Sequence, residues 1–180
     1  NGYQFSSANS MNIGRLVPQI SYYLYTYGQL VRRQEIKLGD EVNFAVPTGN
    51  FGDILAGYYA KKLGLPIKKL ICASNENNVL TDFFNNGVYD KRRKFHLTNA
   101  PAMDILVSSN LGRLLFDLYD ENNYEVASLM NQLTQRGHYQ VSGEVFTKLQ
   151  KNFAAGFATE EEVKSEIKRV YNYDRYVIDP

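Results

Sequence analysis

One stretch of the chain, residues 42–64, constrains its fold more than any other. Residues 42–46 alternate apolar with smaller or polar side chains, which is typical of a strand. Pro47 has no N–H for a ladder hydrogen bond, so we expect the strand to end there. Residues 56–63 then place apolar side chains at helical spacing, and Gly64 predicts the end of that helix. The pattern is strand, short loop, helix.

Gly49 and Gly52 bracket the loop of this unit, and its main-chain N–H groups can converge on an anion. The first N–H groups of a helix have no intrahelical partners, and the helix start carries about half a positive charge. The glycine spacing matches neither a P-loop nor a dinucleotide-binding fingerprint. A phosphate site and a tight turn without a ligand are therefore equally compatible with it. Asp53 would repel a phosphate, so we expect its side chain to point away, capping the helix or pairing nearby.

Composition limits the classes of protein and of partner. The chain has 180 residues, 44% of them apolar, which is enough for one domain with a core. With 20 Lys plus Arg against 19 Asp plus Glu, no net field favours nucleic acid or an anionic membrane. The single cysteine, Cys72, excludes an internal disulfide and favours a reducing cytoplasm. We see no apolar run that could cross a bilayer, no signal peptide and no zinc-type spacing around His96 and His138.

Residues 67–73 read as a second strand, which completes a strand–helix–strand unit with parallel strands. In such sheets ligands bind outside the carboxyl ends of the strands, where the loops 47–52 and 74–78 open. We interpret 74–78 as a turn that caps a helix from Val79 to about Asn85, with a second ligand loop as the alternative. The fold class is therefore α/β, with a parallel sheet and flanking helices.

The other segments are predicted to be mainly helical. A helix capped by Ser10 or Asn12 should run to about Tyr27, its tyrosines serving the core or a subunit contact in a homo-oligomer.

The basic run 91–94 is interpreted as solvated surface. We expect a parallel α/β portion over 1–97 and a mostly helical portion over 98–180, or one domain. Further helices are expected at 111–119 (capped by Ser109 or Asn110), 124–136, 143–149 and 159–171, with an apolar bridge at 153–157 and a closing strand at 175–178.

Four stretches together resemble threonine synthase, a pyridoxal-phosphate enzyme of the tryptophan-synthase-β-like fold (fold type II). Their order and spacing across almost the whole chain carry the likeness, which is greatest to the fungal and bacterial type. They are Ser7–Leu16, Val46–Gly57, Pro101–Asn110 and Ile178–Pro180.

The resemblance implies two phosphate sites. The family's Gly-Asn-Phe-Gly loop holds the phosphate of pyridoxal 5'-phosphate with main-chain N–H groups, and the matching residues are Gly49, Asn50, Phe51 and Gly52. The family's Asn-Ser-x-Asn-x-x-Arg stretch binds the phosphate of the substrate O-phosphohomoserine, and the matching residues are Asn9, Ser10 and Arg15. An arginine with two neutral polar side chains suits a phosphate chemically.

The resemblance also implies what is missing. Nothing in the chain matches the family's Schiff-base lysine motif, and the His-Thr-Ala that comes after Asp-Pro in the family is absent after Pro180. Since the chain also begins with Asn1 rather than Met, we expect an internal piece of a threonine synthase, inactive alone and without catalytic residues of its own. The expected parent is a cytoplasmic enzyme of threonine biosynthesis. The alternatives are another lyase or dehydratase of this fold, which would need no second phosphate site, and a non-catalytic anion-binding module.

Overall fold

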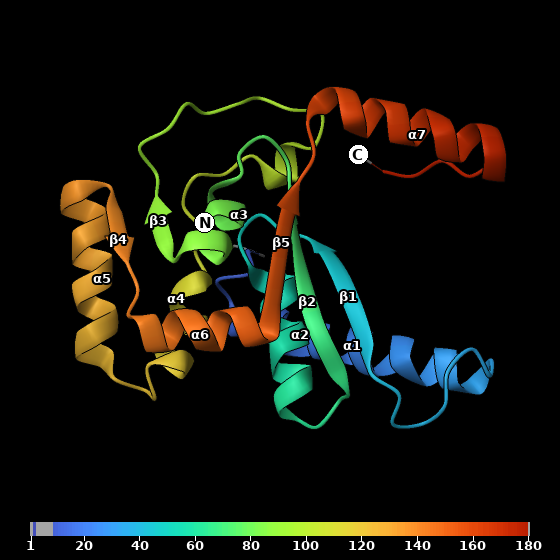
Figure 1. Ribbon diagram of the computed structural model, residues 1–180, viewed down its shortest axis with the longest axis horizontal. Helices are drawn as coiled ribbons and strands as arrows, with labels where there is room; N and C mark the ends of the chain where they lie inside the picture. The colour runs from blue at the N-terminus through green and yellow to red at the C-terminus, as the bar shows by residue number, and fades with distance from the viewer. Residues whose placement is uncertain (1, 3–8, 180) are drawn as a thin grey trace.

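The computed structural model describes residue 2 and residues 9–179, which form a mixed α/β fold around a parallel sheet (Figure 1). The sheet has the strand order β1 (Val42–Pro47), β2 (Ile67–Ser74), β5 (Phe153–Phe157). The central strand β2 pairs in parallel on both sides, with Cys72 opposite Val46 and Ala155. The predicted α/β class with a parallel sheet is confirmed.

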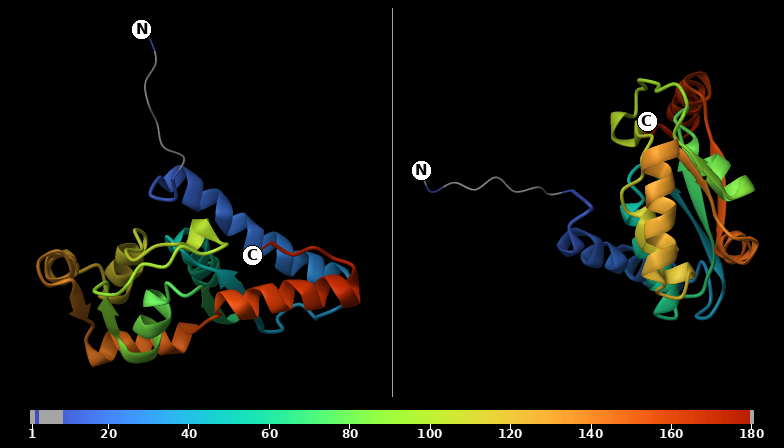
Figure 2. Two further views of the ribbon diagram at one scale, coloured as in Figure 1. Left: turned by 90° about the horizontal axis from the view of Figure 1, so that it is seen from above. Right: turned by 90° about the vertical axis from the view of Figure 1, so that its left-hand side faces the viewer.

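Helices surround this sheet, and a short antiparallel ribbon lies at one end of the molecule. The ribbon pairs β3 (Val88–Asp90) with β4 (His138–Gln140) and lies beside α5, well away from α7 in Figure 1 and in the left view of Figure 2. The helices are α1 (Ile13–Arg32), α2 (Gly52–Lys62), α3 (Val79–Asn86), α4 (Leu111–Leu118), α5 (Asn123–Arg136), α6 (Gly143–Asn152) and α7 (Glu160–Asp174), with a 3₁₀ turn at Pro101–Met103.

The strand–loop–helix unit folds as its sequence pattern predicts. Strand β1 ends at Pro47, α2 begins at Gly52, and Gly64 comes after the helix with a left-handed φ of +103°. Helix α1 packs on α2, and its Asn12 caps it by accepting a hydrogen bond from the N–H of Gly14 at 2.9 Å. The unit is therefore held on the sheet by buried apolar residues of α2, and the helix that packs on it, α1, is capped at its start.

Three predicted boundaries are wrong. Residues 153–157 are not a bridge but strand β5, which pairs with β2 along its whole length. Residues 175–178 form no strand, because no strand among the described residues lies beside them; Arg175 instead ends α7 with a φ of 55°. Helix α1 continues past Tyr27 to Arg32, and it includes Pro18 without ending there. The division at residue 97 stays a prediction.

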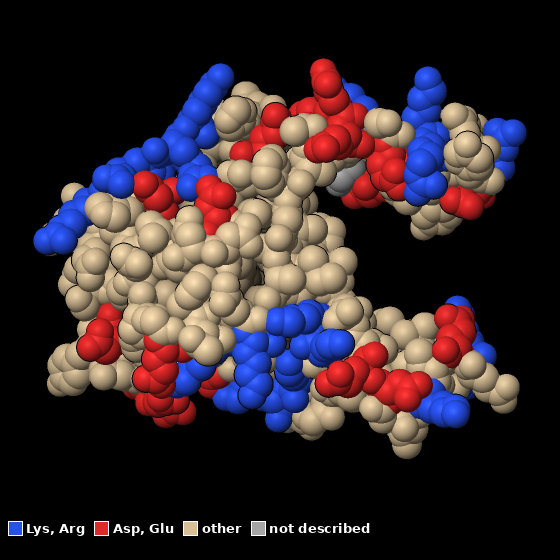
Figure 3. Space-filling view, in the orientation of Figure 1, with Lys and Arg blue, Asp and Glu red and all other residues tan. Residues whose placement is uncertain are grey.

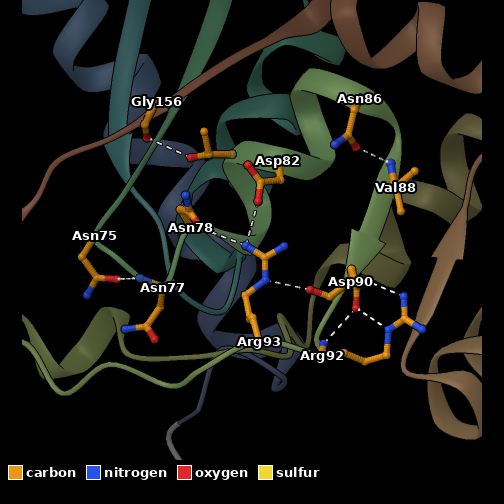
Figure 4. A network of polar contacts seen from close by, with 11 residues as sticks. Asn75, Asn77, Asn78, Asp82, Asn86, Val88, Asp90, Arg92, Arg93 and Gly156 are labelled. Atoms are coloured by element: carbon orange, nitrogen blue, oxygen red, sulfur yellow. Dashed lines mark hydrogen bonds and ion pairs between the residues drawn. The ribbon is translucent and has the colours of Figure 1, made fainter.

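The basic run 91–94 is partly tied down rather than freely solvated. Arg93 donates to Asn78 at 2.8 Å and to Asp82 at 2.7 Å, which joins the run to the start of α3 (Figure 4). Arg92 makes a two-pronged pair with Asp90 (Figure 4). Lysines and arginines gather elsewhere on the lower face shown in Figure 3, where four lysines line a depression with acidic side chains. These lysines are Lys61, Lys62, Lys148 and Lys151.

Within the described part of the chain, no helix is both long and apolar enough to cross a membrane. Of the stretches that carry the resemblance, Ser7, Ala8 and Pro180 lie outside the described residues.

Candidate functional site

A cavity of about 310 Å³ lies at the carboxyl end of β1, at the start of α2. Both groups of residues singled out from the sequence line it: the loop from the first parallel strand and the segment that leads into α1. Those residues are Gly49, Asn50, Phe51, Gly52, Asn9, Ser10 and Arg15, joined by Gln19, Asp53 and Ala102 among others. The structure thus brings together all seven candidates, although the two groups are separated by more than thirty residues in the sequence.

The loop carbonyls are held from outside the loop. Ser108 Oγ donates to the carbonyl of Gly49 at 2.9 Å, and Asn110 donates to the carbonyl of Asn50 from its main-chain N (3.1 Å) and its Nδ2 (2.9 Å). In a trans peptide the N–H points opposite to the carbonyl. The N–H groups of Asn50 and Phe51 are therefore turned away from Ser108 and Asn110. None of the loop N–H groups donates to a residue that the structure describes, which leaves them free for an anion.

Phe51 joins the loop to the core. Its φ of 62° lies in the left-handed region, which a bulky residue rarely adopts. The residue is 1% exposed, and its ring packs against both Phe84 and Phe153 with centroid distances of 5.9 Å. Burial of this ring thus holds the backbone in a conformation that it would otherwise avoid, which sets the direction of the adjacent N–H groups.

Both loop glycines are required by close approach rather than by their φ angles. A Cβ on Gly49 would lie 2.8 Å from the carbonyl oxygen of Ala102. A Cβ on Gly52 would lie 2.6 Å from the Cβ of Ser10 and 3.1 Å from its Oγ. Because real Cβ atoms do not approach this closely, the loop can reach Ala102 on one side and Ser10 on the other only with glycine at both positions.

The second group stands at the entrance to α1. Ser10 is half-buried, and its hydroxyl donates to Asn9 Oδ1 at a long 3.4 Å. Arg15 lies in the first turn of α1, exposed, and lines the same cavity. The cavity is therefore lined by a guanidinium, a hydroxyl and an amide as well as by the loop residues, and these are the donors that phosphate groups require.

Of the two roles expected for Asp53, a helix cap is not found among the described contacts, whereas Tyr23 lies beside it as a neighbouring polar group. Its Oδ1 is buried without a hydrogen-bond partner among the described residues, as is Oε1 of Gln19. Tyr23 donates its hydroxyl to the main-chain carbonyl of Asp53 at 2.9 Å. Burial raises the pKa of the Asp53 carboxyl, and burial together with the Asp53 charge raises the pKa of Tyr23.

The loop after β2 supports the site from behind rather than lining it. Asp104 Oδ1 accepts hydrogen bonds from Asn75 (2.7 Å), Thr98 (2.7 Å) and Asn77 (3.0 Å), and its Oδ2 accepts from the N–H of Thr98 (2.9 Å). This network holds the segment whose Ala102 contacts Gly49. The interpretation of 74–78 as a structural turn agrees with these contacts.

Sequence reasoning missed Ser108, Asn110 and Gln19. The first two lie inside one of the stretches that carry the family resemblance, so a signal was present, but nothing local assigned them to this loop. Gln19 is one turn beyond Arg15 on α1 and had no signal beyond helical spacing.

The chain is similar to threonine synthases along its whole length. No protein-family model matches it. "Threonine synthase-like 1" of Macaca fascicularis is 46% identical over 180 residues, covering 99% of this chain and 24% of that protein. Threonine synthase of Saccharomyces cerevisiae is 38% identical over 191 residues, covering 99% of this chain and 37% of that protein. The crystal structure of pyridoxal-phosphate-bound threonine synthase from Brucella melitensis superposes with a TM-score of 0.90 at 39% identity, over 97% of this chain and 36% of that one.

These comparisons cover only part of each relative. The chain spans between a quarter and two fifths of the length of the curated relatives it matches. Within that span the predicted resemblance and the predicted fold are both confirmed.

Proposed function

The chain is homologous to threonine synthases throughout and has their fold over the region it covers, and from this premise we propose that it supplies the two phosphate sites of such an enzyme. The proposed reaction converts O-phospho-L-homoserine and water into L-threonine and phosphate. The observation that carries the proposal is one cavity lined by two sets of phosphate-type donors. An enzyme of this fold acting on a non-phosphorylated amino acid would need only one such set.

The loop fits the phosphate of pyridoxal 5'-phosphate. Its N–H groups have no other acceptor among the described residues. Its two glycines have no Cβ, which lets the loop lie against Ala102 and Ser10 without a clash. Gly49, Asn50, Phe51 and Gly52 would hold that group. When bound, the cofactor accepts the electrons left behind as a proton is removed next to the substrate amino group.

The second set has a different task, because the substrate phosphate must be held and then released. Arg15 brings a permanent positive charge, and Asn9 and Ser10 bring neutral donors. Together they would orient the substrate so that its phosphate-bearing carbon lies at a fixed distance from the cofactor loop. As phosphate leaves, the same donors would stabilise the charge that builds up on it, before water adds to the neighbouring carbon.

Arg15→Ala tests the substrate assignment in the intact protein. We expect the KM for O-phospho-L-homoserine to rise at least tenfold, because a charge-assisted contact worth roughly 1.5–3 kcal/mol is lost. Pyridoxal-phosphate affinity, followed by absorbance titration, should stay unchanged. Arg33→Ala, at the exposed far end of α1, is the matched control. An unaltered KM in Arg15→Ala, or turnover of L-serine equal to that of the phosphorylated substrate, would contradict the proposal.

Further features of the proposal rest on the sequence. Since nothing in the chain matches the family's lysine motif, we propose that the 180-residue chain alone gives no threonine; a measured yield from the purified chain would contradict this.

The buried free thiol of Cys72 suits a reducing cytoplasm as the place of action. Exposed apolar side chains of α1, including Tyr22, Leu24 and Tyr25, suit contact with further protein, a second copy among the candidates.

A further inference from the structure

The side chain of Asn110 connects the two halves of the cavity. It is 0% exposed, and its Nδ2 lies 2.9 Å from the carbonyl oxygen of Asn50 and 2.9 Å from the Oγ of Ser10. These partners lie 60 and 100 residues away in the sequence. Asparagine before a helix usually caps that helix, but Asn110 makes no side-chain cap on α4. Both of its amide hydrogens serve the loop and the Ser10 segment instead.

Arg113 fixes which way this amide faces. Its guanidinium donates to Asn110 Oδ1, to the carbonyl of Ser10 at 3.3 Å and to the carbonyl of Met11 at 2.7 Å. A guanidinium has donors only, so the Asn110 atom that faces it must be the oxygen. The nitrogen must then face Asn50 and Ser10, and its two hydrogens match these two acceptors.

This polarity determines what Ser10 can offer to a ligand. Because the Ser10 oxygen accepts from Asn110, its own proton must point elsewhere. Among the described residues the only acceptor for that proton is Asn9 Oδ1, at 3.4 Å, a weak contact that an anion can replace. The same amide holds the Asn50 carbonyl, which turns the N–H of Phe51 the opposite way.

We propose that Asn110 is a positioning residue shared by the two phosphate sites: its amide aims a loop N–H at the cofactor phosphate and the Ser10 hydroxyl at the substrate phosphate. This inference rests on the proposed function, because it concerns the same cavity. It goes beyond that function by giving one buried side chain, which touches neither ligand, a part in the geometry of both sites.

The test exchanges the donor for an acceptor at nearly constant shape, with Asn110→Asp in the intact protein. Pyridoxal-phosphate affinity is measured in phosphate-free buffer, and inorganic phosphate affinity is measured on the cofactor-loaded protein. A carboxylate cannot donate to Asn50, and it would accept the Ser10 proton that phosphate needs. We expect both affinities to fall about tenfold. Asn131→Asp, which adds the same charge on the exposed face of α5, should change neither.

A double-mutant cycle separates positioning from general loss of structure. Asn110→Ala should weaken both affinities by a smaller factor. In a Ser10→Ala background, Asn110→Ala should still weaken cofactor binding. It should leave phosphate binding unchanged there, because the Ser10 hydroxyl that Asn110 positions is gone. If Asn110→Asp does not fold by circular dichroism, Asn110→Ala and its cycle decide the question.

Two outcomes would overturn the inference: folded Asn110 variants with affinities within about twofold of wild type, or additive effects of Ser10→Ala and Asn110→Ala on phosphate binding. Wild-type protein that binds neither pyridoxal phosphate nor inorganic phosphate would instead refute the proposed function. The two failures are therefore distinguishable.

Discussion

Gly52 is a residue at which the loop of the proposed cofactor site lies against the Ser10 segment of the proposed substrate site. If the loop holds the cofactor phosphate, as the family resemblance implies, a side chain at this position would crowd that phosphate. The geometry adds a nearer obstacle, because a Cβ would stand 2.6 Å from the Cβ of Ser10. The glycine therefore lets the Ser10 segment lie against the start of α2, and one methyl group would disturb both sites.

We predict that Gly52→Ala weakens both pyridoxal-phosphate and inorganic phosphate binding by at least tenfold, because Ser10 must move and it is bonded to Asn110. Titration of each ligand in the intact protein measures this. Gly112→Ala is the control: it lies in α4, where an added Cβ has nothing within 4 Å, and alanine favours a helix. Cofactor affinity equal to that of wild type in Gly52→Ala would show that the loop does not hold the phosphate.

Single residues were predictable from the sequence where their role is local. Asn12 caps α1 as predicted, and the predicted helix at 159–171 begins with a capping box formed by Thr159 and Glu162. Asn110 was predicted as a helix cap by the same local rule, and there the rule fails. Its partners lie on other segments, so no local pattern could indicate that its amide is used across the fold.

Among the connecting elements, the segment from Thr98 to Asn110 depends on one carboxylate. Burial raises the pKa of Asp104, but hydrogen bonds from Thr98, Asn75 and Asn77 outweigh this and hold the pKa below its ordinary value. The ionised form is thus the one that the folded chain stabilises. This stability is fully present above the unfolded carboxyl pKa of about 3.9 and is lost as the pH falls through the lower folded pKa.

We predict that Asp104→Asn lowers the free energy of unfolding at pH 7 by about 1–3 kcal/mol, since an amide N–H₂ would face the donating N–H of Thr98. Hydrogen exchange of residues 98–110 should quicken more than that of β2. The variant should also lose less stability than wild type on acidification. Asp174→Asn, exposed at the end of α7, is the control. Unchanged exchange in residues 98–110 would mean that the segment is held by packing alone.

Strands show where prediction of elements from sequence reaches its limit. Strands β1 and β2 were predicted because their apolar patterns are strong and the helix between them is short. Strand β5 consists of Phe-Ala-Ala-Gly-Phe, whose small residues have little strand preference, and its pairing with β2 is its main support. The converse error at 175–178 has the same cause: Tyr-Val-Ile favours a strand, yet no described strand lies beside it.

At the scale of the whole molecule, β5 decides how the two halves of the sequence relate. It brings Phe153 to the far side of β2, where the ring packs 5.9 Å from Phe51 and 5.0 Å from Phe84. The aromatic cluster that holds the loop in its left-handed conformation thus includes a residue from the C-terminal half. Helix α7, by contrast, contributes no buried residue. Cofactor binding by the loop should therefore depend on β5 and not on α7.

Two truncations of the 180-residue chain test whether the fold that holds the loop depends on β5 and not on α7. Ending the chain at residue 152 removes β5, leaves β2 with an unpaired edge and takes away Phe153, whose loss alone should cost about 3–5 kcal/mol. We predict that this chain unfolds without a cooperative transition in urea. Ending the chain at residue 158 removes α7 and the C-terminal residues but keeps β5. The dependence of the unfolding free energy on urea concentration scales with the surface exposed on unfolding, so we expect it to stay unchanged. Cooperative unfolding of the shorter chain would contradict the dependence of the fold on β5.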